Sequence, residues 1–438
     1  MNKYARYPEY KDSGVPWLGE IPSHWQNKRL KYTITNVSEK VDAQTSDLRY
    51  FGLENIQSFT GKLLSDVELV SEGVGNTFKK DDVLFGKLRP YLAKVYLAKD
   101  DGLSSTEALI FRATENIDPN FLFYYCLSPD FISAVNGTTF GSKMPRASWD
   151  DIASFKMVYP SIEEQAQIAN FLDHELGKID ALIDKQQLLL DKLAEQRSAV
   201  ITQAVTKGLN PNAEMKDSGV AWLGDVPSHW KVKRLRFGIE INPVKSELKI
   251  KDDTIVSFVP MESVKYDKNL DVTQERLLEE VYKGYTYFKD NDIVLAKITP
   301  CFENGKSAIA KNLMNGIGFG TTELHVLRVN DSFNEQYLYY LIKSEFFMNV
   351  GESEMLGAGG QKRISEEFVK NFLVPFPTFN EQIRIAEFID QETQKIDNMT
   401  DTVNRTIERL KEYRSTLITQ AVTGKIDVRH HNNNKQDV

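Results

Sequence analysis

The stretch PWLGEIPSHW at residues 16–25 returns almost unchanged as AWLGDVPSHW at residues 221–230. Each copy contains two of the chain's five tryptophans. The match covers Lys11–Leu30 in the first copy and Lys216–Leu235 in the second, at a constant offset of 205 residues. A phrase of this composition does not recur by chance, so it indicates an internal repeat of the whole chain.

A second repeat closes each half of the chain. YPSIEEQAQIANFLDHELGKIDALID, which begins at Tyr159, corresponds to FPTFNEQIRIAEFIDQETQKIDNMTD from Phe376, at an offset of 217 residues. This offset holds to the two copies of ITQAVT at residues 201–206 and 418–423. The difference between the offsets means that the second half carries 12 more residues between its two repeats.

The segments between the repeats are similar but divergent. DVLFGKLRPYL (82–92) resembles DIVLAKITPCF (292–302), and SSTEALIFR (104–112) resembles GTTELHVLR (320–328). These short runs, rich in β-branched and aromatic residues and bounded by Gly, Asp and Pro, are typical of strands. Retained ends and divergent middles predict that the ends share one task, whereas the middles perform two versions of another.

The closing repeats predict two long helices. Ser161 with Glu164, and Thr378 with Glu381, form capping boxes that mark helix starts. Each helix would run for about 45 residues, or roughly 65 Å. Apolar residues recur at spacings of four and three, which predicts a coiled-coil seam with polar interruptions. The seam positions are Leu172, Leu176, Ile179, Ile183, Gln186, Leu190, Leu193, Arg197, Val200 and Ala204, then Ile389, Thr393, Ile396, Thr400, Val403, Ile407, Leu410, Arg414, Leu417 and Ala421.

Such apolar stripes need a partner in water. Either each helix packs on its own domain, or the two helices pack on each other. Duplicated halves commonly pair about a two-fold axis, which favours an antiparallel pair. The predicted class is therefore α+β: two mixed α/β domains, two long antiparallel helices in a coiled coil, and an internal pseudo-two-fold repeat. The predicted parts are residues 1–160, 161–207, 208–377 and 378–426, and a disordered tail at 427–438.

Composition narrows the classes of protein. With 41% hydrophobic and 26% charged residues, the 438-residue chain is expected to fold into two or three domains. It has no apolar run of about 18 residues and no signal-like start. Cys126 and Cys301 form no CxxC pair, which argues against disulfides and a metal site and predicts a cytoplasmic location. The net charge of -8 argues mildly against nucleic acid, although a local basic face remains compatible with it.

Basic side chains recur at loop-like positions in both middle segments. Arg, Lys and Gln reach phosphates and the edges of guanine and adenine. For any single residue, a solvated surface charge is the simpler interpretation, but the recurrence favours DNA contact. The candidates are Lys87, Arg89, Lys143, Arg146, Lys297, Lys306, Gln361, Lys362 and Arg363.

Signs of an enzyme are sparse. The chain lacks the paired-proline motif of amino-methyltransferases and a G-x-G-x-x-G loop. His24 and His229 repeat inside PSHW, and a structural role beside Trp25 or Trp230 is favoured over catalysis. The repeated carboxylates in STE and TTE are not acid/base pairs. They are interpreted as buried turns or as hydrogen-bonding groups that face DNA.

Taken together, these motifs resemble a specificity (S) subunit of type I restriction-modification systems. The resemblance rests on DSGVPWLGEIPSHW and its second copy, on GSKMPRAS and GAGGQKRIS, and on the P-S/T-x-x-EQ helix openings. It implies that the two middle regions are target recognition domains, each of which reads one part of a split, asymmetric site in double-stranded DNA. It also implies that the constant helices set the spacing and dock two methyltransferase subunits, through which restriction subunits join.

The resemblance further implies a non-catalytic chain without a cofactor, because S-adenosylmethionine, Mg and ATP would belong to the partner subunits. Two other classes stay open. One is an enzyme with a duplicated unrecognised site, such as a nuclease, and the other is a structural coiled-coil adaptor.

Overall fold

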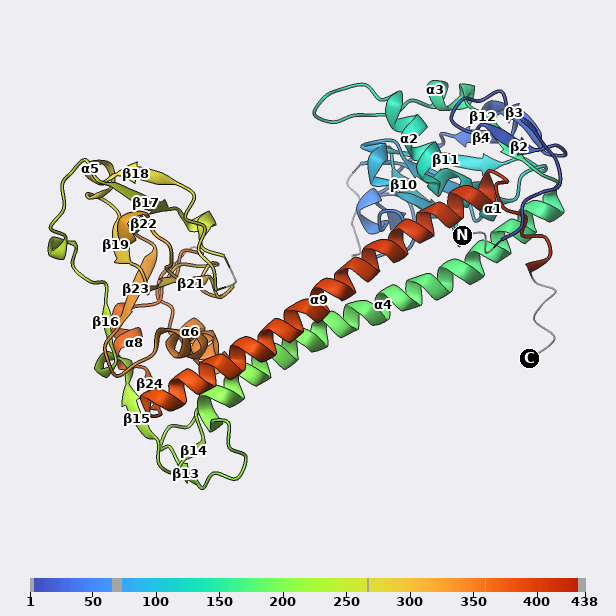
Figure 1. Ribbon diagram of the computed structural model, residues 1–438. Helices are drawn as coiled ribbons and strands as arrows, with labels where there is room; N and C mark the ends of the chain where they lie inside the picture. The colour runs from blue at the N-terminus through green and yellow to red at the C-terminus, as the bar shows by residue number, and fades with distance from the viewer. Residues whose placement is uncertain (1–3, 65–72, 266–267, 359, 432–438) are drawn as a thin grey trace. The chain divides into compact units, whose positions relative to one another are not determined.

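The computed structural model describes residues 4–64, 73–265, 268–358 and 360–431 (Figure 1). Among these residues, none of the helices combines the length and the hydrophobicity that a membrane span requires.

Two compact units make up the chain. Unit 1 consists of Met1–Gln187 and Asn404–Val438, and unit 2 of Leu188–Val403. The unit boundaries fall inside the two longest helices, α4 (Ile162–Lys207) and α9 (Phe379–Val422). Each unit therefore contains one mixed domain and one part of each long helix.

The remaining elements occur in a similar order in the two units. Those of unit 1 are β1 (Tyr10–Asp12), β2 (Glu20–Pro22), β3 (Gln26–Arg29), η1 (Leu30–Tyr32), β4 (Ile34–Val37), β5 (Lys40–Asp42), β6 (Tyr50–Phe51), η2 (Leu53–Asn55), β7 (Val74–Phe78), β8 (Val83–Gly86), η3 (Pro90–Leu92), β9 (Val95–Leu97), β10 (Gly102–Ser105), β11 (Ala108–Ala113), α1 (Pro119–Leu127), α2 (Pro129–Gly137), α3 (Trp149–Ser154) and β12 (Lys156–Tyr159). Those of unit 2 are β13 (Met215–Asp217), β14 (Asp225–Pro227), β15 (Lys231–Arg234), η4 (Leu235–Phe237), β16 (Ile239–Ile241), η5 (Lys245–Glu247), β17 (Ile255–Val259), η6 (Met261–Ser263), β18 (Glu275–Leu277), α5 (Leu278–Val281), β19 (Thr286–Lys289), β20 (Ile293–Ala296), β21 (Ser307–Ile309), η7 (Met314–Gly316), β22 (Ile317–Gly320), β23 (Leu324–Val329), α6 (Glu335–Lys343), α7 (Glu345–Ser353), α8 (Glu366–Asn371) and β24 (Leu373–Phe376).

The sheets confirm the internal repeat. An antiparallel sheet of order β4-β11-β8-β9 in unit 1 has its counterpart in β16-β23-β20-β21 of unit 2. A second sheet runs β5-β7-β10-β6 in unit 1 and β18-β17-β22-β19 in unit 2. Three strands of this sheet correspond between the units. The fourth strand, β5 in unit 1 and β18 in unit 2, pairs at opposite edges of the sheet, so the middle segments differ in strand order as well as in sequence.

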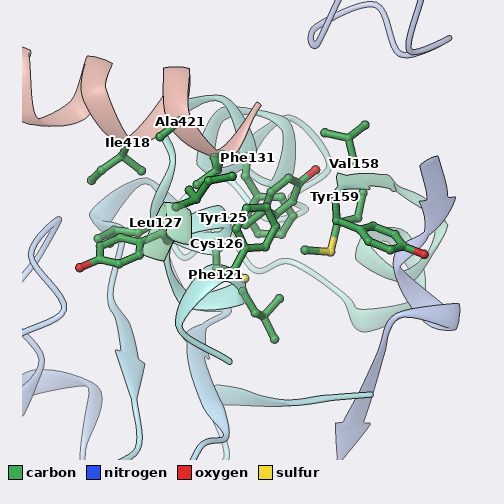
Figure 2. Packing of buried hydrophobic residues seen from close by; sticks show 14 of the residues in the cluster. Phe121, Tyr125, Cys126, Leu127, Phe131, Val158, Tyr159, Ile418 and Ala421 are labelled. Atoms are coloured by element: carbon green, nitrogen blue, oxygen red, sulfur yellow. The ribbon is translucent and has the colours of Figure 1, made fainter. Parts of the chain in front are cut away.

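The central sheet of unit 1 is buried on both faces, which explains its continuous apolar strands. Along β8, Val83 and Phe85 belong to the core that contains α1 and α2, whereas Leu84 belongs to a smaller core with Phe51 and Phe78. The aromatic residues of α1 and α2 lie beside Ile418 and Ala421 of α9 (Figure 2). The end of α9 is thus part of the core of unit 1.

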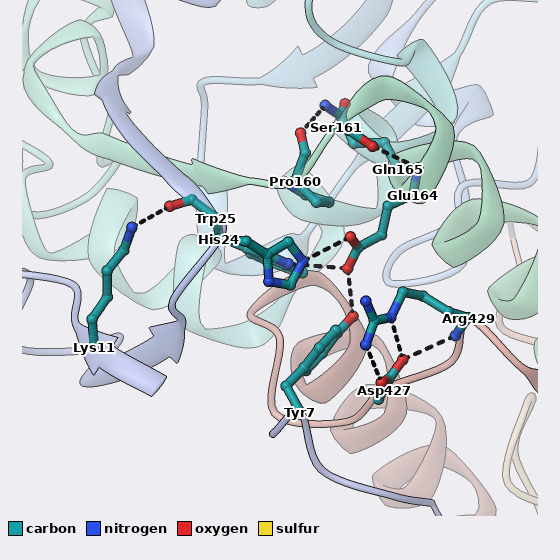
Figure 3. Close-up of polar contacts among 10 residues, drawn as sticks. All are labelled: Tyr7, Lys11, His24, Trp25, Pro160, Ser161, Glu164, Gln165, Asp427 and Arg429. Carbon is teal, nitrogen blue, oxygen red and sulfur yellow. Dashed lines mark hydrogen bonds and ion pairs between the residues drawn. The ribbon is translucent and has the colours of Figure 1, made fainter. Parts of the chain in front are cut away.

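The two kinds of sequence repeat meet at the start of each long helix. In unit 1, Trp25 Nε1 donates to Glu164 Oε1 at 3.1 Å, and His24 Nε2 lies 2.9 Å from Glu164 Oε2 (Figure 3). In unit 2, Trp230 Nε1 and His229 Nε2 lie 3.3 and 2.7 Å from Glu381 Oε1. Both histidines contact the capping glutamates, a partner that the structural interpretation of PSHW did not specify.

The same tryptophans also contact the ends of the long helices. Gly424, just after α9, lies against Trp25 in unit 1, and Gly208, just after α4, lies against Trp230 in unit 2. Both glycines have left-handed backbones, with φ of +70° and +71°, as is common where a helix ends. Each tryptophan is therefore held between the start of one long helix and the end of the other.

The long helices pair in an antiparallel sense. Asp180 of α4 binds Arg414 of α9 at 3.0 Å in unit 1, and Arg197 of α4 binds Asp397 of α9 in unit 2. Residue numbers rise along one helix as they fall along the other. The pairs are equivalent at the 217-residue offset, so the two seam arginines, Arg197 and Arg414, form two copies of one ion pair between the helices.

The predicted seam positions lie inward. The structure buries Leu172, Ile179, Leu193, Ile396, Val403, Ile407 and Leu417, and it half-buries Ile183, Leu190 and Leu410. The two packing alternatives for the helices do not exclude each other. The first turns of α4, with Ile168 and Phe171, belong to the core of their own domain, and that core also contains the end of α9.

One prediction about the end of the chain is wrong. Residues 427–431 do not form a disordered tail, because Asp427 bridges to Ala5 and Val428 is buried in the core of unit 1. This segment lies between the end of a predicted helix and a polar stretch of sequence. Val428, its buried apolar residue, was therefore not recognised as part of a core. The rest of the predicted tail, 432–438, lies outside the described residues.

Candidate nucleic-acid interface

In unit 1, the loop with GSKMPRAS lies along the chain that leaves β8. Lys87, directly after β8, accepts a hydrogen bond from Ala147 N at 3.0 Å through its carbonyl, and Arg89 N donates to Pro145 O at 2.8 Å. On the other side, Lys87 N donates to Glu107 O at 3.0 Å. Backbone hydrogen bonds therefore bring together residues about 20 and 60 positions apart in the chain.

These backbone contacts place a cation next to a carboxylate. Arg146 Nε donates to Glu107 Oε2 at 3.0 Å, and the two side chains are 37% and 29% exposed. Exposed ion pairs of this kind contribute about 0–1 kcal/mol to stability, so this pair serves mainly to orient the guanidinium group. Its Nη atoms have no hydrogen-bond partner in the described part of unit 1 and are available as donors.

Unit 2 repeats the arrangement. Lys297, directly after β20, donates through its backbone N to Glu323 O at 2.9 Å, and its carbonyl accepts from Ile364 N at 2.9 Å. Arg363 donates through Nε and Nη2 to the two carboxylate oxygens of Glu323, both at 2.9 Å. A lysine, a glutamate and an arginine thus form the same cluster in both units, although the neighbouring residues differ.

The charges in the unit 2 cluster act on one another. The hydrogen bond from Arg363 lowers the pKa of the Glu323 carboxyl, and the nearby Lys297 acts in the same direction. The same hydrogen bond raises the pKa of Arg363. Glu323 therefore stays ionised and holds a charged guanidinium group at a fixed place.

Most of the predicted DNA-binding residues gather at these two clusters. Arg89 and Lys143 are exposed beside the first, and Gln361 and Lys362 are exposed beside the second. Lys143 lies on the loop between α2 and Arg146. Lys306 differs, because its ammonium group donates to Met261 O at 3.3 Å and so contacts the protein's own backbone.

The sequence analysis missed the counterpart of Lys306. Lys94 of unit 1 donates to Leu53 O at 2.6 Å, at the equivalent place before the next strand. Extending the alignment of DVLFGKLRPYL with DIVLAKITPCF, with a gap of two residues in the first copy, would have paired the two lysines.

A polar group behind the unit 2 cluster was also missed. His325 is buried in β23, where its Nε2 lies 3.0 Å from Ile364 O and its Nδ1 lies 3.4 Å from the side chain of Asn242. Asn242 also donates to Glu366 at 3.0 Å. Burial lowers the pKa of His325, which favours its neutral form. The equivalent residue in unit 1 is Leu109. The histidine in LHVLR, where the first copy has a leucine, was the sequence signal that could have identified this buried polar group.

The clusters suit nucleic-acid contact chemically. An arginine held by a carboxylate presents its remaining N–H groups in a fixed orientation, as readout of a base edge requires. The exposed cations around it, none of them ion-paired among the described residues, suit phosphate oxygens. The part of the chain that the structure describes contains no group of three His, Cys, Asp or Glu side chains that could hold a metal ion.

Comparisons with known proteins agree with this chemistry. Residues 66–189 and 227–409 match the family model described as the type I restriction modification DNA specificity domain. The specificity subunit of the EcoAI type I restriction enzyme from Escherichia coli is 40% identical over 201 residues. That match covers 45% of this chain and 33% of the relative, so the chain spans about a third of the length of this relative.

Two further comparisons extend over nearly the whole chain. The MjaVIII specificity subunit from Methanocaldococcus jannaschii is 23% identical over 427 residues, or 94% of this chain and 95% of that protein. A solved chain, from work on complex assembly and conformational transition of the type I R-M system, superposes with a TM-score of 0.71 at 18% identity. It covers 92% of this chain and 98% of its own, which shows a shared fold.

Proposed function

Because the chain belongs to the family of type I restriction-modification DNA specificity domains, we propose that it is the DNA-recognition subunit of a type I restriction-modification complex. Each unit reads one part of a bipartite, asymmetric site in double-stranded DNA. The long helices set the spacing and dock two methyltransferase subunits, through which restriction subunits join. S-adenosylmethionine, Mg and ATP belong to those partners, and the complex works in the cytoplasm.

One observation carries this proposal. The lysine–glutamate–arginine cluster occurs at equivalent strands of both units, but the residues around it differ. Arg89 is replaced by Thr299, for instance, and Leu109 by His325. Two copies of one scaffold with different surroundings are suited to reading two unrelated half-sites. The clusters also supply a local basic surface on a chain whose net charge is -8.

Removal of the unpaired lysines tests the proposal. We expect Lys87→Ala and Lys297→Ala each to weaken DNA binding by the complex. Each should also reduce the slope of log affinity against log salt concentration by about one, as the loss of one phosphate contact predicts. Gel shifts at several salt concentrations measure both effects. Lys80→Ala and Lys311→Ala are the controls, because these lysines are exposed in the same units but lie outside the clusters.

Native mass spectrometry of the same samples reports assembly with the methyltransferase. Loss of assembly in the cluster variants would assign these lysines a structural role. Unchanged DNA affinity in both variants would place the interface elsewhere. DNA cleavage or methyl transfer by the purified chain alone would favour the enzyme alternative.

A further inference from the structure

A short loop of the mixed domain in unit 1 extends from that domain to the long helices. The loop 57–62 follows η2 and is closed by a hydrogen bond from Gln57 N to Lys62 O at 2.8 Å. The residues at its two ends, Ile56 and Leu63, form a β-bridge and pack in the smaller core of the domain. The base of the loop is therefore anchored in its own domain.

The far end of this loop binds both long helices. Lys62 Nζ lies 2.9 Å from Asp180 Oδ2 of α4. Arg414 of α9 donates from Nη1 to Phe59 O at 2.7 Å and from Nη2 to Thr60 O at 3.4 Å. Arg414 also donates through Nε to Asp180 Oδ1 at 3.0 Å. We call Lys62, Asp180, Arg414 and the two loop carbonyls the unit 1 clasp.

Polar contacts rather than apolar packing hold this loop against the helices. Phe59 and Leu64 are 49% and 48% exposed, so their burial contributes little. A cavity of about 690 Å³ is lined by the loop and by both long helices. The side chain of Arg414, by contrast, is only 9% exposed. Because a buried charge that loses its partners is costly, Arg414 keeps Asp180 and the loop carbonyls together.

The clasp joins a second layer of the unit 1 domain to the helices. The main core, which contains the central sheet, α1 and α2, also contains Leu172 of α4 and Ile418 of α9. The smaller core behind that sheet contains, among the described residues, none from either long helix. A domain that is attached through both layers resists rotation about the helices more than one attached through a single layer.

Unit 2 makes the same kind of contact at a different place on its helix. The loop between η6 and β18 carries Lys268, whose Nζ lies 2.7 Å from Asp390 Oδ1 of α9. At the 217-residue offset, Asp390 corresponds to Asp173 of α4, which comes seven residues before Asp180. Seven residues span about 10 Å of helix. The loops of the two units are therefore attached at different distances from the starts of their helices.

Unit 2 also contains the ion pair between the helices without a clasp around it. Arg197 and Asp397 correspond to Arg414 and Asp180 at the 217-residue offset. Among the described residues of unit 2, Arg197 binds Asp397 but no loop of the mixed domain. Its side chain is 37% exposed, against 9% for Arg414. The chain thus offers a matched pair of arginines, of which only Arg414 binds a loop.

We propose that the unit 1 clasp and the Lys268–Asp390 pair fix the orientation of each mixed domain on the long helices, and thereby restrict the gap between half-sites that the chain accepts. The lengths of the helices alone do not restrict the gap, because a domain that rotates on its helix reaches half-sites at several separations. Lys62, Arg414 and Lys268 are therefore positioning residues. The proposal rests on the proposed function, because that function supplies the bipartite DNA site.

The test compares Arg414→Gln with Arg197→Gln in the complete complex with the methyltransferase. Each variant breaks one ion pair between the helices, but only Arg414→Gln also releases a loop. Methylome sequencing of the wild-type strain first gives the native gap. Methylation is then measured on DNA duplexes whose gap is native, one base pair shorter or one base pair longer.

We expect Arg414→Gln to raise the ratio of altered-gap to native-gap methylation about tenfold or more, since hydrogen bonds from a charged group stabilise enough for such a change. Lys62→Met should raise the ratio about threefold, because its ion pair is partly exposed. Arg197→Gln should leave the ratio unchanged. The bases that are read in each half-site should stay the same in all three variants.

A rise in either clasp variant without a rise in Arg197→Gln supports the proposal. An unchanged ratio in both clasp variants would overturn it, and so would an equal loss of methylation at every gap, which assigns these residues a structural role only. An equal rise in Arg197→Gln would assign the effect to the pairing of the helices. If Arg414→Gln does not fold, Lys62→Met decides the outcome. A wild-type motif without a gap would instead contradict the proposed function.

Discussion

At the scale of single residues, the capping glutamates serve more than their helices. Glu381 accepts hydrogen bonds from Thr378 N and Oγ1 at the start of α9, and it also contacts His229 and Trp230. Burial alone raises the pKa of this carboxyl, but the hydrogen bonds from His229, Thr378 and Trp230 outweigh burial and hold the pKa at about 2. The glutamate that marks the start of the helix therefore also binds side chains that are distant in the sequence.

This lowered pKa predicts a pH dependence of stability. Because the folded-state pKa lies below the ordinary value of 4.5, the contribution of Glu381 is complete above about pH 4.5 and is lost as the pH falls towards 2. We expect Glu381→Gln to lower the free energy of unfolding at pH 7 by at most about 3 kcal/mol and to flatten its change below pH 5. Urea unfolding at several pH values measures both.

Glu392→Gln is the control on the same helix. Glu392 forms an exposed ion pair with Lys395, worth less than about 1 kcal/mol. Parallel pH profiles for the wild type and Glu381→Gln between pH 5 and 2 would refute the role of Glu381.

At the scale of elements, local signals were sufficient for the long helices. The S/T-x-x-E boxes predicted starts at Ser161 and Thr378, and α4 and α9 begin one residue later. The end of α9 was predicted less well, at residue 426 against the observed Val422. The helix ends there because Gly424, two residues later, has a left-handed backbone.

The candidate clusters were only partly predictable. Their lysines and arginines stood out because they recur in both halves, but the partner of each arginine did not. Glu107 and Arg146 are 39 residues apart, and their contact depends on a loop that lies along the chain after β8. Backbone pairing over such a separation leaves no pattern in the local sequence, so the repeated glutamates stayed ambiguous between a turn and a DNA-facing group.

The glycines after the long helices allow a graded prediction. Alanine in a left-handed backbone costs about 1–2 kcal/mol, so Gly208→Ala and Gly424→Ala should both lower the free energy of unfolding. Gly424→Ala should cost more, because its Cβ would lie 2.7 Å from Pro22 Cγ, whereas at Gly208 the nearest atom is 3.0 Å away. Urea unfolding of the full chain measures the two changes.

Gly177→Ala is the matched control. Gly177 lies inside α4 with open space around its Cβ position, so alanine should raise stability by up to about 1 kcal/mol. A Gly424→Ala chain as stable as the wild type would show that the end of α9 does not pack tightly against Pro22 and Trp25.

At the scale of the whole molecule, duplication separates two tasks. The repeated PSHW phrases and helix starts form the same junction in both units, whereas the sheets between them differ in an edge strand and in the residues around each cluster. A change inside one middle segment leaves the junctions intact. The two halves of the recognised DNA should therefore be exchangeable independently.

Chimeras test this independence. We expect replacement of residues 31–158 by those of another specificity subunit to change one half of the methylated DNA motif, and replacement of residues 236–375 to change the other half. Single-molecule methylome sequencing of strains that carry each chimera with its partner subunits reads the motif directly. As a control, replacement of PWLGEIPSHW at residues 16–25 by AWLGDVPSHW should change neither half of the methylated DNA motif, because both segments form the same junction. Changes in both halves from one exchange, or a motif without an internal gap, would refute the division into two readers.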